Sequence, residues 1–178
     1  MLTTPILLVE DEENDVFFFK RALQKEGVMN RLLVAKDGQA AIDYLQGEGP
    51  FANREKFPLP GLILLDLKLP FVMGLDVLKW IREQSKSTSI VLILSSSPDE
   101  EDVASAYRLG ANAYLVKPAE PSQLAVIVRS IKSFWLTANT PPPNFLTEPR
   151  PQVLAGIDFQ PATPSPAPAF PNIFNNKL

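Results

Sequence analysis

Residues 61–70, with the sequence GLILLDLKLP, decide the fold of this chain. Four consecutive apolar residues lead to the single carboxylate of Asp66, and a glycine and a proline bound the segment. A short apolar run of this kind is typical of a strand that is buried on both faces of a parallel sheet. Asp66 would then lie at the carboxyl end of the strand, the edge at which open α/β sheets bind ligands. Taken alone, Asp66 is better explained as a turn-forming residue.

Four further apolar runs follow the same pattern, at residues 5–9, 32–35, 90–94 and 113–116. Each of the five runs precedes a segment with helical spacing, at about residues 14–26, 37–46, 76–82, 98–109 and 120–136. Asn14 or Asp15 is the expected cap of the first helix, and Asp37 that of the second. The alternation predicts an α/β fold in which a doubly wound, five-stranded parallel sheet has helices on both faces.

The composition excludes several classes of protein. The 178 residues are 46% apolar and 21% charged, with a net charge of −3 and no Cys or His. The absence of His and Cys excludes a Ser-His triad, thiolate metal sites, disulfides and a phosphohistidine carried by this chain. No segment concentrates Lys and Arg, so we expect no binding of nucleic acid. No apolar run approaches the ~18 residues of a membrane helix, and no basic signal region precedes the first strand, so we expect a cytoplasmic protein without membrane contact.

The composition changes at residue 139. Ten of the eighteen prolines lie in the last forty residues, which favours extended or disordered structure. We therefore expect a domain at residues 1–138 and a Pro-rich tail at residues 139–178. Apolar residues in the tail could also dock on the domain or bind a partner.

The last predicted helix is apolar nearly all round, and only one of its faces can cover the sheet. We therefore expect a homodimer that forms through this region, unless the tail covers the same face. The apolar residues concerned are Leu124, Ala125, Val126, Ile127, Val128, Ile131, Phe134, Trp135 and Leu136.

Polar residues follow four of the five predicted strands. Glu10 and Asp11 follow the first, Asp66 the third, Ser95 the fourth and Lys117 the fifth. Because parallel strands end at the same edge, these groups can converge. Clustered carboxylates suit Mg²⁺, which binds one or two of them together with phosphate oxygens. A carboxylate can itself be the nucleophile toward a phosphoryl group, with the metal and an ammonium stabilising the charge.

At these residues the chain resembles the receiver domain of two-component response regulators, the CheY-like fold. The resemblance covers about residues 4–136, and it rests on residues 7–11, on residues 64–70 with Gly74, on residues 94–96 and on residues 110–118. It implies that Asp66 is the phosphoacceptor, that Ser95 and Tyr114 are switch residues, and that Lys117 is the lysine of the site. It also implies that Glu10, Asp11, Asp66 and the backbone carbonyl of Lys68 bind Mg²⁺, and that the Lys117–Pro118 bond is cis.

The implied function is signalling rather than turnover. A histidine kinase would donate the phosphoryl group, and the protein would catalyse only its own phosphorylation and dephosphorylation. With no DNA-binding domain expected after residue 138, the output would be protein–protein contact. The loop at residues 47–60 and the end of the last helix resemble the small regulators of bacterial phytochrome kinases. The family varies at the position of Lys68, so the lifetime of the phosphorylated state stays open.

Several alternatives remain. The protein could be a phosphorelay intermediate, or a receiver-like scaffold without regulated phosphorylation. A flavodoxin-like flavin binder would need a phosphate-binding first loop, where this chain has the acids of residues 10–13. A haloacid dehalogenase-type hydrolase would need a second Asp two residues after Asp66, where Lys68 stands.

Overall fold

The five apolar runs form one parallel sheet in the structure, a computed structural model that describes residues 4–84 and 89–141. The strands are β1 (Ile6–Val9), β2 (Leu32–Ala35), β3 (Leu62–Leu65), β4 (Ile90–Ser95) and β5 (Ala113–Val116). Their order in the sheet is β2-β1-β3-β4-β5, and every neighbouring pair is parallel. The predicted doubly wound α/β fold is therefore confirmed.

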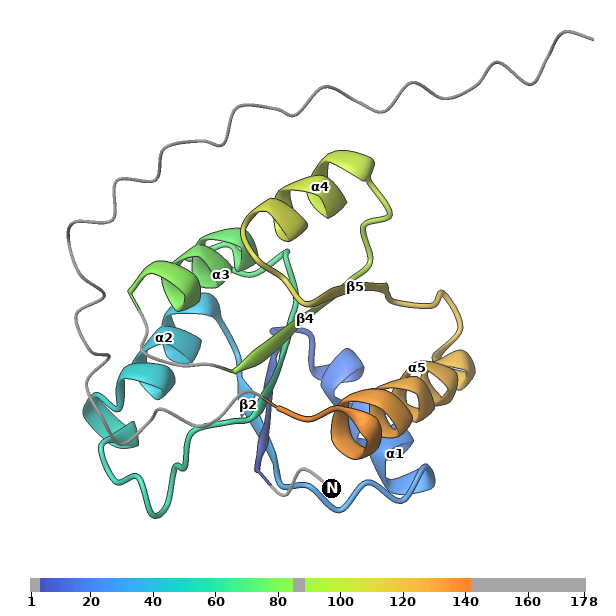
Figure 1. Cartoon of the computed structure of the whole chain (residues 1–178), viewed down its shortest axis with the longest axis horizontal. Helices are drawn as coiled ribbons and strands as arrows, with labels where there is room; N and C mark the ends of the chain where they lie inside the picture. Colours follow the sequence, from blue (N-terminus) through green and yellow to red (C-terminus); the bar gives the residue numbers. More distant parts are fainter. Residues whose placement is uncertain (1–3, 85–88, 142–178) are drawn as a thin grey trace, which may run out of the picture.

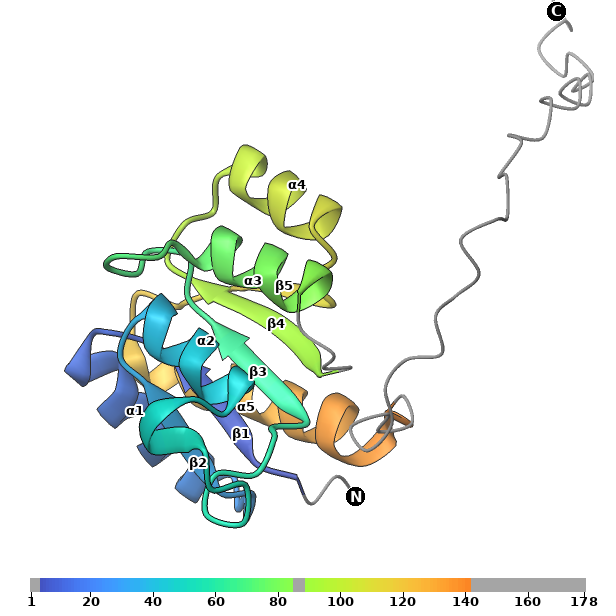
Figure 2. The same cartoon turned by 90° about the vertical axis from the view of Figure 1, so that its left-hand side faces the viewer.

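Helices cover both faces of the sheet (Figures 1 and 2). They are α1 (Glu13–Lys25), α2 (Gly38–Gln46), α3 (Gly74–Glu83), α4 (Glu100–Arg108) and α5 (Leu124–Ile131). Strand residues alternate between the two faces, because successive side chains of a strand point in opposite directions. Leu7 and Ile63 pack in the cluster that includes α2 and α3, whereas Leu8 and Leu64 pack in the cluster that includes α1 and α5.

Helix α1 begins earlier than the sequence predicts. Its N-cap is Glu12, which makes no side-chain capping hydrogen bond, so the expected cap at Asn14 or Asp15 is wrong. Both residues lie inside the first turn, because the chain turns into the helix only three residues after β1 ends. The cap predicted for α2 is confirmed, since the side chain of Asp37 accepts a 2.7 Å hydrogen bond from the backbone N–H of Ala40.

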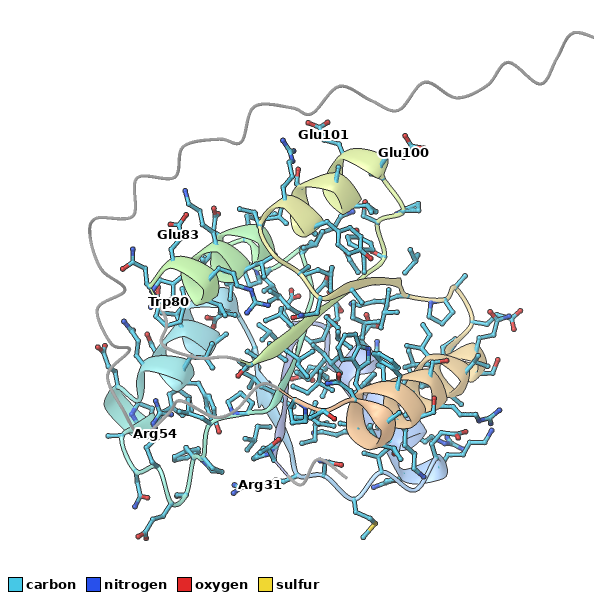
Figure 3. All side chains as sticks on the ribbon, in the orientation of Figure 1. Arg31, Arg54, Trp80, Glu83, Glu100 and Glu101 are labelled. Atoms are coloured by element: carbon cyan, nitrogen blue, oxygen red, sulfur yellow. The ribbon has the colours of Figure 1, made fainter. Side chains whose placement is uncertain are left out.

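The helices differ in how firmly they are attached to the sheet. Among the residues of α4 only Ala106 is buried, and the carboxylates of Glu100 and Glu101 point away from the sheet (Figure 3). Helix α5 buries four of its eight residues. In addition, Arg129 forms an ion pair with Glu26 at the end of α1.

The last predicted helix is divided into three parts. A 3-10 turn (Pro121–Gln123) precedes α5, and a π-helical segment (Lys132–Ala138) follows it. A proline at the first position of the turn starts the segment but cannot donate a backbone hydrogen bond. Val126 and Phe134 are the large apolar side chains of this region that are more than half exposed.

The connection at residues 47–60 has a defined structure. Gly47 ends α2 with a φ of 78°, in the left-handed region that favours glycine. The guanidinium of Arg54, labelled in Figure 3, donates hydrogen bonds of 2.7 Å to the carbonyls of Tyr44 and Leu45 at the end of α2. Because these carbonyls lack partners within the helix, Arg54 fixes the loop against α2.

The predicted Pro-rich tail falls almost entirely on residues 142–178, which lie outside the described residues. Within the described part of the chain, no helix is long and apolar enough to cross a membrane.

Candidate functional site

Three carboxylates meet at the carboxyl edge of the sheet. Glu10 follows β1 directly, and Asp66 follows β3 in the neighbouring position, because Val9 pairs with Leu65. One oxygen from each of Glu10, Asp11 and Asp66 lies within 4.8 Å of the others. Glu10 is 1% exposed and Asp66 is 6% exposed, so two of the three charges are held out of water. The convergence predicted from the strand ends is therefore present.

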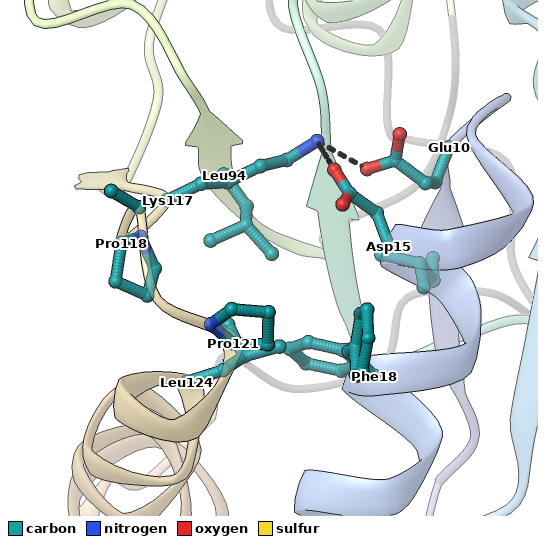
Figure 4. Close-up of a pocket in the computed structure, with 11 residues that line it drawn as sticks. Glu10, Asp15, Phe18, Leu94, Lys117, Pro118, Pro121 and Leu124 are labelled. Atoms are coloured by element: carbon teal, nitrogen blue, oxygen red, sulfur yellow. Dashed lines mark hydrogen bonds and ion pairs between the residues drawn. The ribbon is translucent and has the colours of Figure 1, made fainter.

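Lys117 joins this group from the end of β5. Its Nζ lies 2.5 Å from Oε2 of Glu10, 2.8 Å from Oδ2 of Asp66 and 2.8 Å from Oδ2 of Asp15 (Figure 4, where the contacts to Glu10 and Asp15 are dashed). The backbone N–H of Lys117 donates a 2.8 Å hydrogen bond to the carbonyl of Ser95, which fixes where the side chain starts. Three carboxylates therefore surround one ammonium.

The electrostatics of the site follow from burial. Burial raises the pKa of Glu10 to about 7, although the hydrogen bond and attraction to Lys117 oppose this change. Burial alone would lower the pKa of Lys117, but hydrogen bonds to the three carboxylates outweigh it and raise that pKa above its ordinary value. The ammonium therefore keeps its proton, and Glu10 is the group that takes up a proton near neutral pH.

The loop after β3 holds the Asp66 carboxylate in place. Its Oδ1 accepts hydrogen bonds from the backbone N–H groups of Leu67, at 2.6 Å, and Lys68, at 3.3 Å. The loop closes where the N–H of Gly74 donates to the carbonyl of Leu67. A Cβ at Gly74 would lie 2.0 Å from the carbonyl oxygen of Asp66, so this close approach requires glycine.

Ser95 and Tyr114 lie on the side of the site that faces α4. Ser95 is fully buried at the end of β4, and its Oγ accepts a 3.4 Å hydrogen bond from the backbone N–H of Ser97. The hydroxyl of Tyr114 donates to the carbonyl of Ser97 at 2.8 Å, and Oγ of Ser97 donates to Asp102 of α4 at 2.7 Å. These contacts connect the edge of the sheet to α4.

One expectation for the site is wrong. The described residues include no cis peptide bond, so the Lys117–Pro118 bond is trans. The trans form is the lower in energy for a bond to proline, by about 0.5–1 kcal/mol.

The contact of Asp15 with Lys117 is not predicted from the sequence. There Asp15 is expected only as a possible cap, whereas the structure brings this residue into contact with Lys117 from the first turn of α1. The position of Asp15, five residues after Glu10, is the sequence feature that could have predicted this contact. A helix that starts directly behind a strand places its first turn over the same edge of the sheet.

The donor set fits a divalent cation that prefers oxygen ligands, such as Mg²⁺. Glu10, Asp11 and Asp66 present oxygens close together, and Lys117 is the ammonium that pairs with carboxylates of this site, so the site carries an excess of negative charge. The predicted metal ligands Glu10, Asp11 and Asp66 are thus brought together by the fold.

Comparison with known proteins gives a consistent family. The model of the response regulator receiver domain matches residues 6–129. The response regulator Rcp1 of Synechocystis is 38% identical over 138 residues, which are 77% of this chain and 92% of Rcp1. The crystal structure of the Mn²⁺-bound form of Rcp1 superimposes with a TM-score of 0.70 and covers 78% of this chain and 99% of its own.

Two further solved structures belong to phytochrome regulators. The phosphorylated cyanobacterial phytochrome response regulator RcpA is 38% identical, with a TM-score of 0.72 and coverage of 79% of this chain and 99% of its own. The bacteriophytochrome response regulator RtBRR is 45% identical, with a TM-score of 0.61 and coverage of 80% and 86%.

Proposed function

The chain belongs to the response regulator receiver domain family, and from this premise we propose that it accepts a phosphoryl group on Asp66 and passes the signal on by protein–protein contact. The arrangement of Lys117 is the observation that carries the proposal. Its ammonium lies against the buried Asp66 carboxylate, beside two further acidic residues that can bind a metal. A receiver domain is a signalling component rather than a conventional enzyme, and a histidine kinase is its phosphoryl donor.

The transfer needs little from this chain beyond a placed carboxylate and positive charge. An oxygen of Asp66 forms the new O–P bond as the N–P bond of the donor's phosphohistidine breaks, and the histidine nitrogen keeps the bonding electron pair. The Leu67 and Lys68 N–H groups hold the orientation of the carboxylate. The Lys117 ammonium is placed to stabilise charge on the phosphoryl oxygens, which is the main requirement of this chemistry.

Glu10, Asp11, Asp66 and the backbone carbonyl of Lys68 are the groups that we propose hold Mg²⁺. When bound, the ion supplies charge neutralisation at the phosphoryl oxygens. The fit of the oxygen donors supports this assignment, and the relative Rcp1 has been crystallised in a Mn²⁺-bound form.

The response would pass through Ser95 and Tyr114 to the surface made by α4, β5 and α5. Tyr114 is already connected to α4 through Ser97 and Asp102. Burial, with a smaller contribution from the Asp102 charge, raises the pKa of the Tyr114 phenol, so its hydroxyl stays protonated and can donate. Phosphorylation of Asp66 adds negative charge and would thus shift the equilibrium between two arrangements of this surface, as in other phosphorylation switches.

We further propose that the donor is a kinase of the phytochrome type. The support is the similarity to RcpA and RtBRR, whose chains are covered to 99% and 86%. Because such a kinase is phosphorylated from ATP, a cytoplasmic location follows from the proposal. We assign the receiver to residues 1–138 and leave residues 139–178 as a separate tail.

A homodimer through α5 and the segment after it completes the proposal. Val126 and Phe134 are exposed by 59% and 53% on this surface, although both are large and apolar. Light scattering at tens of micromolar should give twice the mass of the chain. A monomer under those conditions would contradict this part.

The central test is phosphoryl uptake. The protein with Mg²⁺ and a small phosphodonor such as phosphoramidate should gain one acid-labile acyl phosphate, seen by native mass spectrometry. The gain should disappear in Asp66→Ala and in the presence of EDTA. A wild-type protein that gains no phosphoryl group would refute the proposal and favour a receiver-like scaffold.

Phosphoryl transfer onward to a second histidine protein would instead identify a phosphorelay intermediate. In that case the phosphoryl group would leave Asp66 and appear on the second protein.

A further inference from the structure

The ammonium of Lys117 has no free hydrogen-bond donor in the structure. A lysine ammonium carries three protons, and three carboxylate oxygens, from Glu10, Asp15 and Asp66, lie within 2.8 Å of its Nζ. Any new acceptor that binds Lys117 must therefore replace one of these three. Contact with an incoming phosphoryl oxygen is such a case.

The three partners are not equivalent. The side chains of Glu10 and Asp66 are 2% and 7% exposed, whereas that of Asp15 is 44% exposed. Water can therefore solvate the Asp15 carboxylate when the ammonium leaves it, but cannot do so for the other two. In addition, Glu10 and Asp66 belong to the group of oxygens that can bind a metal, and Asp15 does not.

The surroundings restrict where the ammonium can go. Beneath it lies a cavity of about 120 Å³, whose floor is made mainly of apolar side chains such as Phe18, Leu94 and Leu124 (Figure 4). These apolar side chains offer no hydrogen-bond acceptor to a charged ammonium, whereas the carboxylates above them do, so the ammonium stays in the layer of carboxylates. Figure 4 shows Asp15 reaching this layer from α1, separately from the strand-end residue Glu10.

We propose that Asp15 is a positioning residue that keeps Lys117 paired while a divalent cation occupies Glu10 and Asp66, and that releases Lys117 to the phosphoryl group. The inference rests on the proposed function and deepens it. Without the Asp15 charge, cation binding leaves the ammonium beside a divalent charge and without a charged partner. Release to the phosphoryl oxygens, in contrast, becomes easier, because a neutral acceptor holds the ammonium more weakly.

The test uses Asp15→Asn, which keeps the shape and removes the charge. Two quantities are measured on the full chain: the Kd for Mg²⁺ by calorimetry, and the phosphorylation rate constant with phosphoramidate at saturating Mg²⁺. A charge-assisted hydrogen bond exceeds a neutral one by a factor of roughly five in equilibrium constant. We expect the Kd for Mg²⁺ to rise about fivefold and the saturated rate constant to rise about fivefold as well.

Glu12→Gln is the matched control. It removes one acidic charge from the same loop, its side chain is exposed and it makes no capping hydrogen bond. Both quantities should change less than twofold in this control. Asp15→Glu, which restores the charge, should bring the Mg²⁺ affinity back toward that of the wild type.

Two results would overturn the inference. One is an Asp15→Asn variant that behaves like the Glu12→Gln control. The other is a variant with weaker Mg²⁺ binding and a lower saturated rate, since a residue that only holds the site together would impair both steps. The Mg²⁺ titration requires no phosphorylation, so an unchanged Kd overturns the inference by itself. Failure of the wild type to take up a phosphoryl group would refute the proposed function instead.

Discussion

The buried carboxylate of Glu10 should make the metal-free protein less stable as the pH rises from 5 to 8. Burial raises its pKa from 4.5 to about 7 in the folded state. The folded state therefore binds more protons than the unfolded chain in this interval, and the free energy of unfolding falls with increasing pH. The stabilising effect is complete below pH 4.5 and is lost as the pH rises through 7.

The magnitude follows from the size of the shift. Each pKa unit corresponds to ~1.4 kcal/mol, so the change from 4.5 to about 7 gives a loss of about 3 kcal/mol. The composition makes this interval unusually clear to observe. The chain has no His and no Cys, so no other side chain has an ordinary pKa between 5 and 8. Lys117, whose pKa is raised, titrates far above this range.

The assay is urea denaturation in EDTA at pH 5, 6, 7 and 8, followed by circular dichroism. Glu10→Gln should abolish most of the pH dependence, and Glu13→Gln, on an exposed side chain of the same region, should keep it. A wild-type stability that is constant from pH 5 to 8 would refute the reasoning. So would a slope that survives in Glu10→Gln.

Three further substitutions test the site and its loops. Gly74→Ala places a Cβ 2.0 Å from the carbonyl oxygen of Asp66. The free energy of unfolding in urea should therefore fall by about 2 kcal/mol or more, and phosphoryl uptake should also fall. An unchanged urea midpoint would contradict the close contact. Phe71 has a φ of 65° and a side chain that is 91% exposed. Because Asn tolerates the left-handed region better than Phe, Phe71→Asn should raise the free energy of unfolding by about 1 kcal/mol. A lower melting temperature would count against backbone strain at this position. Lys117→Met leaves Glu10 and Asp66 buried without their ammonium. Urea denaturation in EDTA at pH 8 should therefore show a free energy of unfolding that is lower by ~3–5 kcal/mol, and Mg²⁺ should largely restore it. A loss of stability that Mg²⁺ does not reduce would indicate damage to packing instead.

The strands could be predicted closely because burial on both faces leaves a simple signal. Ile63 and Leu64 point to opposite faces of the sheet and both faces are buried, so the run has no polar positions, and β3 occupies residues 62–65 of the apolar segment. The convergence of Glu10, Asp66 and Lys117 could be predicted for a related reason. Parallel strands all end at one edge, so residues that follow them are neighbours whatever their distance in sequence.

Features that depend on tertiary contacts were harder to predict. Asp is a residue type that often caps helices, so the sequence suggests only that role for Asp15. The position of α1 over the edge of the sheet is what brings Asp15 to Lys117. The structure of the loop at residues 47–60 could not be predicted, because the Arg54 hydrogen bonds that fix it end on backbone carbonyls, which every residue has. The long apolar segment after Pro121 predicts one helix, whereas the structure has a π-helical end with Leu136 buried in the cluster that also includes α1 and the sheet.

The weak attachment of α4 has a consequence for where a signal can leave the domain. With one buried residue, Ala106, this helix exposes little new apolar surface when it shifts. Displacing α4 would cost a free energy on the order of one charge-assisted hydrogen bond, ~1.5–3 kcal/mol, such as that between Ser97 and Asp102. Its contact through Asp102 to Ser97 lies within two residues of the sheet edge at Ser95. In the proposed switch, α1 and α5, which the Arg129–Glu26 ion pair joins, can therefore stay fixed as the frame against which α4 is displaced.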